Sequence, residues 1–300
     1  MRLVESMHSV TVGVCAHNEE KNIKNSLSAI SSQRVKDFRI DEILVVSSGS
    51  TDRTDEIVRK YMEKDQRVRL IVQEKREGKY SAVNLIIRES KGGIIALVNA
   101  DNILAENALS YLLSPFRNDH VGMTGGHPVP VNSPTTITGF AVRMLWDLHH
   151  RLSLIAPKTG ELIAFRNLGF ELPKGTNTDE DWIKMEIERR GYRVVYVPEA
   201  IVYNKGPETI EEFLKQRIRV NIGEMYMKKR FNFTVPTWNL SYLLPAFASF
   251  CKEHQSQIDK IAAAIALETI ARIYAKVHVI LNRSDKHIWE IVDSTKGFSI

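Results

Sequence analysis

Cysteine is scarce in this sequence, which contains only Cys15 and Cys251. The two lie far apart and fit no metal-binding spacing, which favours a reducing cytoplasmic setting over a secreted disulfide scaffold. Uninterrupted apolar runs of about 18 residues are also missing, so we expect no transmembrane helix. Residues 1–9 lack the continuous apolar core of a signal peptide. These absences predict a cytoplasmic protein.

What is present is an ordinary globular composition, with 43% apolar and 26% charged residues. The length of 300 residues suffices for one large α/β domain and a smaller appendage. The formal charge of +5 is a mild basic excess that suits a phosphate-bearing ligand or an anionic membrane surface. The basic residues do not alternate with aromatics along one stripe, so we expect no nucleic-acid binding.

Short β-branched apolar runs alternate with helical segments through the first hundred residues. The expected strands are 10–14, 42–46, 68–72 and 94–98, and the expected helices are 22–31, about 52–64 and 78–90. Such alternation is typical of a mostly parallel sheet with helices on both faces.

Beyond residue 101 the alternation is less regular. The expected strands are 122–131, which includes a turn, 161–166 and 193–197, and the expected helices are 137–154, 182–190 and 211–229. Pro236 marks a plausible boundary, after which the pattern is helical to about residue 282. We therefore divide the chain into a catalytic domain, 1–232, and a C-terminal helical segment, 233–300.

Three polar clusters follow expected strands: residues 17–20, 47–52 and 99–102. In open sheets of this kind, ligands bind beyond the carboxyl ends of the strands. Asp101 at such a position can hold a hard divalent cation. The alternative is a loop aspartate that caps a helix at 102–105.

Three further features are each open to two interpretations. Lys79 begins an expected helix, where it either neutralises a phosphate or is simply solvated. The acidic run 179–181 either caps the next helix or supplies a base. Gln216 and Arg219 share one helix face and either reach a common ligand or form a basic surface.

Seven short motifs occur in a fixed order along the chain, and their order is more specific than any single motif. They are A-H-N-E-E, S-S-G-S-T-D, G-K with A-x-N, N-A-D in place of D-x-D, G-E-L-I-A-F-R, D-E-D, and Q-R-I-R-V where many relatives have Q-x-x-R-W. In this order they resemble the family 2 inverting glycosyltransferases. The match covers about residues 10–230 and implies a GT-A type fold, a mixed and mostly parallel sheet.

The resemblance implies a role for each matching residue. Asp101 is implied to bind the divalent metal, Mn²⁺ or Mg²⁺. Asp181, or its neighbour Glu180, is implied to deprotonate the acceptor. The residues implied to bind the nucleotide or its diphosphate are His17, Asn18, Glu19, Ser48, Asp52, Lys79, Asn99, Asp101, Gln216 and Arg219. The expected reaction moves a sugar from a nucleotide diphosphate sugar to an acceptor hydroxyl or lipid phosphate.

Four departures from the family pattern affect these expectations. Asn99 stands where the first D-x-D aspartate is usual. Ser48 replaces an aspartate that often contacts uracil, which leaves both UDP- and GDP-sugars open as donors. Val220 stands where a tryptophan is usual, which weakens an inference of processive synthesis. The spacing from Asp181 to Gly191 is about one residue short, which keeps Glu180 in contention as the base.

The C-terminal segment contains an apolar helical pattern at 258–281, broken by charges that exclude a membrane-spanning role. Packing on the catalytic domain, an oligomer interface and a membrane-interfacial position all remain open. We favour peripheral contact with the cytoplasmic face of the membrane, because Trp238, Tyr242, Trp289 and the basic run 228–230 suit an interface.

Two other functions compete with transfer. A sugar-phosphate nucleotidyltransferase is disfavoured because such enzymes carry a glycine-rich loop where this chain has A-H-N-E-E. A non-catalytic nucleotide-sugar-binding subunit is suggested by Asn99, but Asp101, Asp181 and Arg219 disfavour it.

Overall fold

The computed structural model describes residues 8–281 and 293–298. Its described part contains one sheet of eight strands in the order β3-β2-β1-β4-β7-β6-β8-β5. The strands are β1 (His8–Ala16), β2 (Phe38–Ser48), β3 (Val68–Gln73), β4 (Ile94–Asn99), β5 (Ile103–Leu104), β6 (Val121–Pro130), β7 (Leu162–Arg166) and β8 (Arg193–Asn204).

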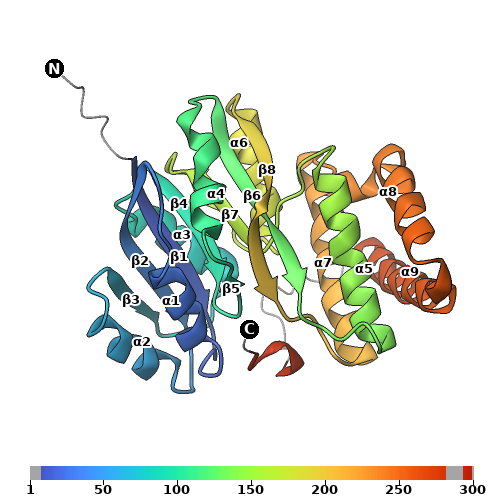
Figure 1. The fold of residues 1–300 in the computed structure, drawn as a ribbon, viewed down its shortest axis with the longest axis horizontal. Helices are drawn as coiled ribbons and strands as arrows, with labels where there is room; N and C mark the ends of the chain where they lie inside the picture. The colour runs from blue at the N-terminus through green and yellow to red at the C-terminus, as the bar shows by residue number, and fades with distance from the viewer. Residues whose placement is uncertain (1–7, 282–292, 299–300) are drawn as a thin grey trace.

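Helices cover both faces of this sheet, and a further group of helices lies beside one side of it (Figure 1). The helices are α1 (Ile23–Ser31), α2 (Thr54–Met62), α3 (Lys79–Glu89), α4 (Ala108–Leu113), α5 (Ile137–Ser153), α6 (Asp179–Arg189), α7 (Ile210–Phe231), α8 (Leu240–Glu253) and α9 (Ile258–Ile280). A short 3₁₀ helix, η4 (Asp293–Thr295), belongs to the C-terminal segment.

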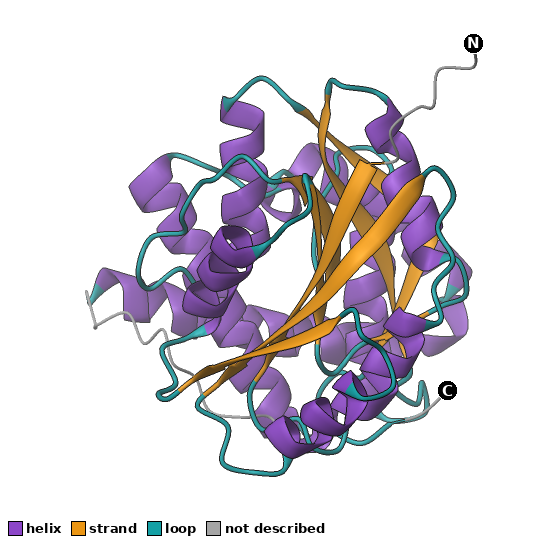
Figure 2. Cartoon of the chain, turned by 90° about the vertical axis from the view of Figure 1, so that its left-hand side faces the viewer, coloured by secondary structure: helices purple, strands orange, loops and turns teal. Residues whose placement is uncertain are grey.

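Strands β3, β2, β1 and β4 run parallel, so their carboxyl ends meet at one edge. Strand β7 pairs antiparallel with both β4 and β6, whereas β6 and β8 run parallel. The expected mixed, mostly parallel sheet with helices on both faces is therefore confirmed. Figure 2 shows the twisted sheet between its helices.

The central strands are buried on both faces, which explains their continuous apolar runs. Along β2, Ile43 and Val45 face the core with α1, α2 and α4, whereas Leu44 and Val46 face the core with α3 and α6. This alternation follows from the two-residue period of a strand. Packing on both faces holds the strands in place, and with them the sheet edge from which the polar loops emerge.

The C-terminal helices pack against α5 and α7 and form a third apolar cluster with them. Phe213 of α7, Phe250 of α8 and Ile261 of α9 lie in this cluster. One face of the C-terminal segment thus packs on the rest of the chain. Trp289, which the sequence suggested for a membrane interface, lies outside the described residues, and the division at residue 232 remains a prediction.

The outer face of α9 is apolar and exposed. Its exposed side chains include Ile270, Ile273, Tyr274, Val277 and Ile280, and Leu281 directly after the helix is also exposed. Within the described ranges, none of the helices has the length and apolarity that crossing a bilayer requires.

Two local expectations were wrong. The acidic run 179–181 is not on a loop, because α6 begins at Asp179 and places all three acids in its first turn. Carboxylates at that position are stabilised by the helix dipole, so they extend the helix instead of preceding it. No helix occupies 102–105. Residues 103–104 instead pair with β8 as strand β5, and α4 begins at Ala108.

Candidate active site

The loop after β1 and the loop after β2 are hydrogen-bonded to each other at the carboxyl edge of the sheet. His17 Nδ1 lies 2.7 Å from the carbonyl oxygen of Ser48. The backbone N–H of Asn18 donates to Ser50 Oγ (3.1 Å), and Asn18 Oδ1 accepts from the N–H of Thr51 (2.8 Å). His17, Asn18 and Ser48 are thus brought together as the sequence predicted.

Asp52 has a local structural role within this pair of loops. One carboxylate oxygen accepts from the backbone N–H of Thr54 (2.9 Å), and the other accepts from the N–H of Glu20 (3.0 Å). Burial tends to raise the pKa of Asp52, but these hydrogen bonds outweigh it and hold the pKa below its usual value. Asp52 thus binds the first residue of α2 to the loop after β1.

Gly49 is required where the second loop turns. Its φ is +62°, and a Cβ there would lie 2.5 Å from the backbone nitrogen of Arg76. Any side chain would clash with the segment that leads into α3. The neighbouring Ser48 is 6% exposed, and its hydroxyl has no hydrogen-bond partner in the described chain. A buried hydroxyl without a partner at a loop edge is a group that a ligand can satisfy.

Asp101 stands in a tight turn directly after β4. The backbone N–H of Asn102 donates to the carbonyl of Asn99 (3.1 Å), which closes the turn. Burial, and next the carboxylate of Glu19, raise the pKa of Asp101 to about 6. Within residues 8–281 and 293–298, its side chain has no hydrogen bond or salt bridge with another residue, and the only hydrogen bond to it there comes from its own backbone N–H. The turn therefore presents a carboxylate that feels both the negative charge of Glu19 and the positive charges of Lys296 and Lys79.

Lys79 joins the first turn of α3 to the first turn of α6. Its Nζ lies 2.9 Å from Asp179 Oδ2 and 2.8 Å from Glu180 Oε1. Burial, and next the charge of Glu180, raise the pKa of Asp179 to about 7. Burial also opposes ionisation of Glu180, but Lys79 outweighs it and holds the pKa of Glu180 below its usual value. Lys79 therefore favours the ionised form of Glu180, whereas burial and the charge of Glu180 favour the protonated form of Asp179.

Arg219 on α7 faces these acids. The acidic residues whose charges act on it are Glu161, Asp179, Glu180 and Asp101. Burial lowers the pKa of Arg219 more than these acids raise it. It forms no hydrogen bond or salt bridge with any described residue. Gln216 lies one turn earlier on the same helix face.

Asp181, the first choice for the base from the sequence, belongs to a different cluster. Its Oδ2 lies 4.0 Å from Lys158 Nζ, which also contacts Glu224 Oε1 at 2.7 Å. Trp238 Nε1 donates to the other oxygen of Glu224 (2.6 Å). Asp181 is 5% exposed and its Oδ1 has no hydrogen-bond partner in the described part of the chain. This cluster joins the acidic motif to the C-terminal helices.

The C-terminal segment 293–298 returns to the first loop (Figure 1). Lys296 Nζ donates to the carbonyl of Asn18 (3.0 Å) and to the carboxylate of Glu19, and the N–H of Gly297 donates to Asn22 Oδ1 (2.7 Å). Sequence reasoning gave Lys296 no role. It is an additional cation at the edge where Glu19 and Asp101 lie.

Comparison with known proteins decides the family. The model of glycosyl transferase family 2 matches residues 11–176, and that of glycosyl transferase family group 2 matches residues 94–265. The chain belongs to the family 2 glycosyltransferases. This membership supports the transferase interpretation over the nucleotidyltransferase one.

Curated relatives of this glycosyltransferase chain are longer than it is. It is 28% identical over 244 residues to the probable glycosyltransferase YdaM of Bacillus subtilis (strain 168), covering 76% of this chain and 58% of the relative. It is 25% identical over 230 residues to a poly-beta-1,6-N-acetyl-D-glucosamine synthase of Staphylococcus aureus (strain COL), covering 72% and 54%. The chain thus spans just over half the length of these relatives.

Solved structures confirm the GT-A type fold. The mannosyltransferase PcManGT from Pyrobaculum calidifontis, solved with GDP-Man and Mn²⁺, matches with a TM-score of 0.64 and 23% identity. The match covers 92% of this chain and 88% of that one. TarS from S. aureus, residues 1–349 solved with UDP, matches with a TM-score of 0.52 and 16% identity, covering 95% of each chain.

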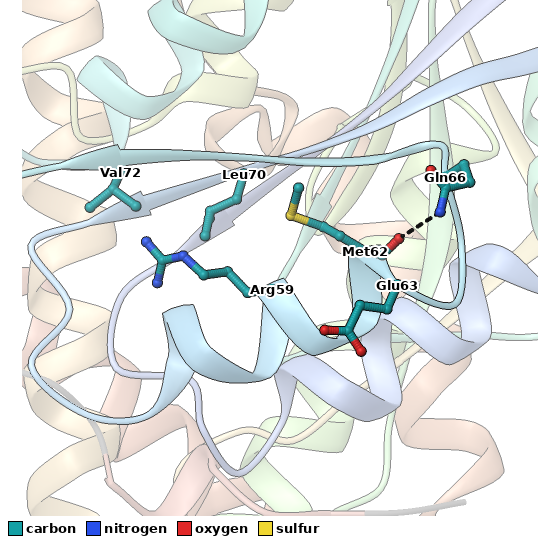
Figure 3. A pocket seen from close by; sticks show the side chains of 6 residues that line it. All are labelled: Arg59, Met62, Glu63, Gln66, Leu70 and Val72. Carbon is teal, nitrogen blue, oxygen red and sulfur yellow. Dashed lines mark hydrogen bonds between the residues drawn. The ribbon is translucent and has the colours of Figure 1, made fainter.

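A shallow pocket lies away from this site in the family 2 domain, between α2 and the edge strand β3 (Figure 3). It is lined by Arg59, Met62, Glu63, Gln66, Leu70 and Val72, and Gln66 Nε2 donates to the carbonyl of Met62 (3.4 Å). None of the residues that the sequence assigned to the site lines it. The carboxyl edge of β1, β2 and β4 therefore remains the candidate active site.

Proposed function

We propose that this chain transfers a sugar from a nucleotide diphosphate sugar to an acceptor, with inversion at the anomeric carbon and with the help of a divalent cation. The observation that carries the proposal is the meeting of Asp101, Lys79, Glu180 and Arg219 at the sheet edge of a family 2 glycosyltransferase. The set combines a carboxylate for a metal, cations for a diphosphate and an ionised carboxylate for a proton.

The residues present fit a divalent cation. Asp101 has no side-chain partner in another described residue, and burial, followed by the charge of Glu19, opposes its ionisation. A hard cation with oxygen ligands neutralises such charge, and Mg²⁺ or Mn²⁺ commonly uses one or two carboxylates plus phosphate oxygens. Three or more metal-ligating side chains do not converge anywhere in the described chain. When bound, the cation offsets the negative charge that develops on the leaving diphosphate.

The cationic residues have a complementary task. Arg219 lies near Asp101 and forms no ion pair within the described residues, so its guanidinium is available to a phosphate. Lys79, at the N-terminus of α3, adds a second charge and the helix dipole. Fixed charges in a partly buried edge stabilise a leaving group without first having to reorient.

For the base we propose Glu180 in place of Asp181. Glu180 shares Lys79 with Asp179 and faces Arg219, whereas Asp181 points into the cluster with Lys158 and Glu224. An ionised Glu180 can accept the acceptor's proton as its oxygen attacks. This choice also agrees with the short spacing from Asp181 to Gly191.

For the acceptor we propose a hydroxyl or phosphate carried by a lipid. The support is the exposed apolar face of α9 together with the basic residues Lys228, Lys229 and Arg230 at the end of α7. Such a face, placed at a membrane interface, would bring the site to a lipid-borne acceptor. Co-sedimentation with anionic vesicles tests this, and Ile273→Glu with Ile280→Glu should abolish it. Concentration-dependent dimerisation without vesicle binding would favour a second copy of the chain instead.

The experiment for the proposed function measures nucleotide diphosphate release from UDP- and GDP-sugars, with and without Mn²⁺, in the presence of membrane lipids. We expect metal-dependent release with one base, and NMR of the product should show an inverted anomeric configuration. Asp101→Asn should lose the release, whereas the exposed Asp259→Asn, a matched change on α9, should keep it. Retention of configuration would contradict the inverting mechanism.

A further inference from the structure

The first position of the family's D-x-D motif carries no charge in this chain, because Asn99 occupies it. A carboxylate nevertheless lies against that position. Strand β7 pairs antiparallel with β4, with Leu162 opposite Val98, so the next step of the register brings Glu161 opposite Asn99. Asn99 Nδ2 donates to Glu161 Oε2 at 2.8 Å.

The other end of the Asp101 turn holds the same carboxylate. Asn102 Nδ2 donates to Glu161 Oε2 at 3.0 Å and to the carbonyl of Glu161 at 3.2 Å. Because the N–H of Asn102 closes the turn on Asn99, the two amides that bind Glu161 flank Asp101. The side chain of Glu161 is therefore held by the two residues that flank Asp101 in this tight turn.

The hydrogen bonds leave one oxygen of Glu161 available. Both amides donate to Oε2, which has two lone pairs, and Oε1 takes no hydrogen bond from any described residue. The charge of Glu161 raises the pKa of Arg219, but the two side chains form no salt bridge in the described chain. Asp101 likewise has no hydrogen bond or salt bridge with another described residue, so its carboxylate and Oε1 of Glu161 are both available as oxygen ligands.

The backbone at Glu161 is also unusual. Its φ is +60°, in the left-handed region that glutamate rarely adopts. A simple bend before β7 would be served better by glycine or asparagine. A glutamate there is expected where the carboxylate itself is needed, since local strain concentrates at functional positions.

We propose that Glu161 is the second carboxylate ligand of the divalent cation, in the place that Asn99 leaves uncharged. Asp101 and Oε1 of Glu161 then provide two oxygen ligands, and the phosphates of the donor and water complete the set. Asn99 and Asn102 orient Glu161 through its other oxygen. This inference rests on the proposed function, because it assumes that the chain uses a metal.

The test measures Mn²⁺ binding directly, by the loss of the free Mn²⁺ EPR signal, with Mn²⁺ alone and then with UDP or GDP added. Glu161→Gln should weaken Mn²⁺ binding by at least about tenfold. Adding Asn99→Asp to that variant should restore most of the affinity, since it returns a carboxylate to the facing position. The exposed Glu171→Gln is the matched control and should bind Mn²⁺ as the unmodified chain does.

The outcomes separate this inference from the proposed function. If Asp101→Asn abolishes Mn²⁺ binding but Glu161→Gln leaves it unchanged, the inference is wrong and the metal-dependent transferase stands. If Asn99→Asp fails to rescue Glu161→Gln while melting temperatures in EDTA are equal, Glu161 does not replace the missing ligand. If the unmodified chain transfers sugar fully in EDTA and binds no Mn²⁺, transfer stands and both metal assignments fall.

Discussion

Lys79 Nζ lies 2.8 Å from Oε1 of Glu180, although 101 residues separate the two in the sequence. The contact joins α3, which begins at Lys79, to the first turn of α6. It places a cation beside the proposed base and therefore links the donor side of the site to the acceptor side. Two of the predictions below depend on it.

Glu180→Gln should stop sugar transfer while leaving donor binding nearly intact. The amide keeps the shape of the side chain but cannot accept the acceptor's proton, so we expect a decrease in kcat of at least about 100-fold. Rates with saturating donor and calorimetric binding of the nucleotide diphosphate measure the two effects. If Asp181→Asn stops transfer and Glu180→Gln does not, the base is Asp181, as first predicted from the sequence.

Lys79→Met should move the acidic limb of the pH–rate profile to higher pH. Lys79 holds the pKa of Glu180 below its usual value, so the base stays ionised as the pH falls towards that value. Without Lys79, the effect of burial dominates, so the pKa of Glu180 rises and the active ionised form is lost at a higher pH. The profile is measured with saturating donor, because Lys79 is also proposed to bind the diphosphate. An unshifted limb would contradict this coupling.

Glu224→Gln should destabilise the fold strongly. Glu224 and Lys158 form a buried ion pair with side chains 2% and 13% exposed, and Trp238 also donates to Glu224. Removing one charge of a buried ion pair typically costs about 3–5 kcal/mol of unfolding free energy, and the Asp181 carboxylate that remains lies 4.0 Å from Lys158 Nζ. Chemical denaturation measures the loss.

The matched control for Glu224 is the exposed pair of Lys60 and Glu56 on α2, whose side chains are 68% and 53% exposed. Lys60→Met should change the unfolding free energy by no more than about 0.5 kcal/mol. If Glu224→Gln costs no more than this control, the link between the acidic motif and the C-terminal helices does not stabilise the fold.

The parts of the fold that follow from local pattern were predictable. The runs at 42–46 and 94–98 alternate between two cores, and a strand buried on both faces must be apolar throughout. The loops after these strands were placed correctly because parallel strands end at one edge. The start of α6 was not, since an acidic run suits both a loop and a first helical turn.

The features that the sequence left open or did not indicate depend on contacts between distant segments. The phase of α6 decides whether Glu180 or Asp181 faces Lys79, because consecutive residues on a helix point about 100° apart. Glu161 meets Asn99 through an antiparallel register that no local pattern sets. Lys296 reaches Glu19 across 277 residues of sequence. The clue for Glu161 was present, because Asn99 left the metal motif one carboxylate short.

The central claim, a metal-assisted nucleotide diphosphate sugar site, is tested most directly by thermal melting with UDP, GDP, CDP and dTDP, each with and without Mn²⁺. A ligand that binds only the folded chain raises its melting temperature. At a free ligand concentration of 100 times the Kd, it adds about 2.7 kcal/mol to the unfolding free energy. The account predicts a shift with one nucleotide diphosphate that Mn²⁺ enlarges and that Asp101→Asn removes. No shift with any of the four, with or without metal, would contradict it.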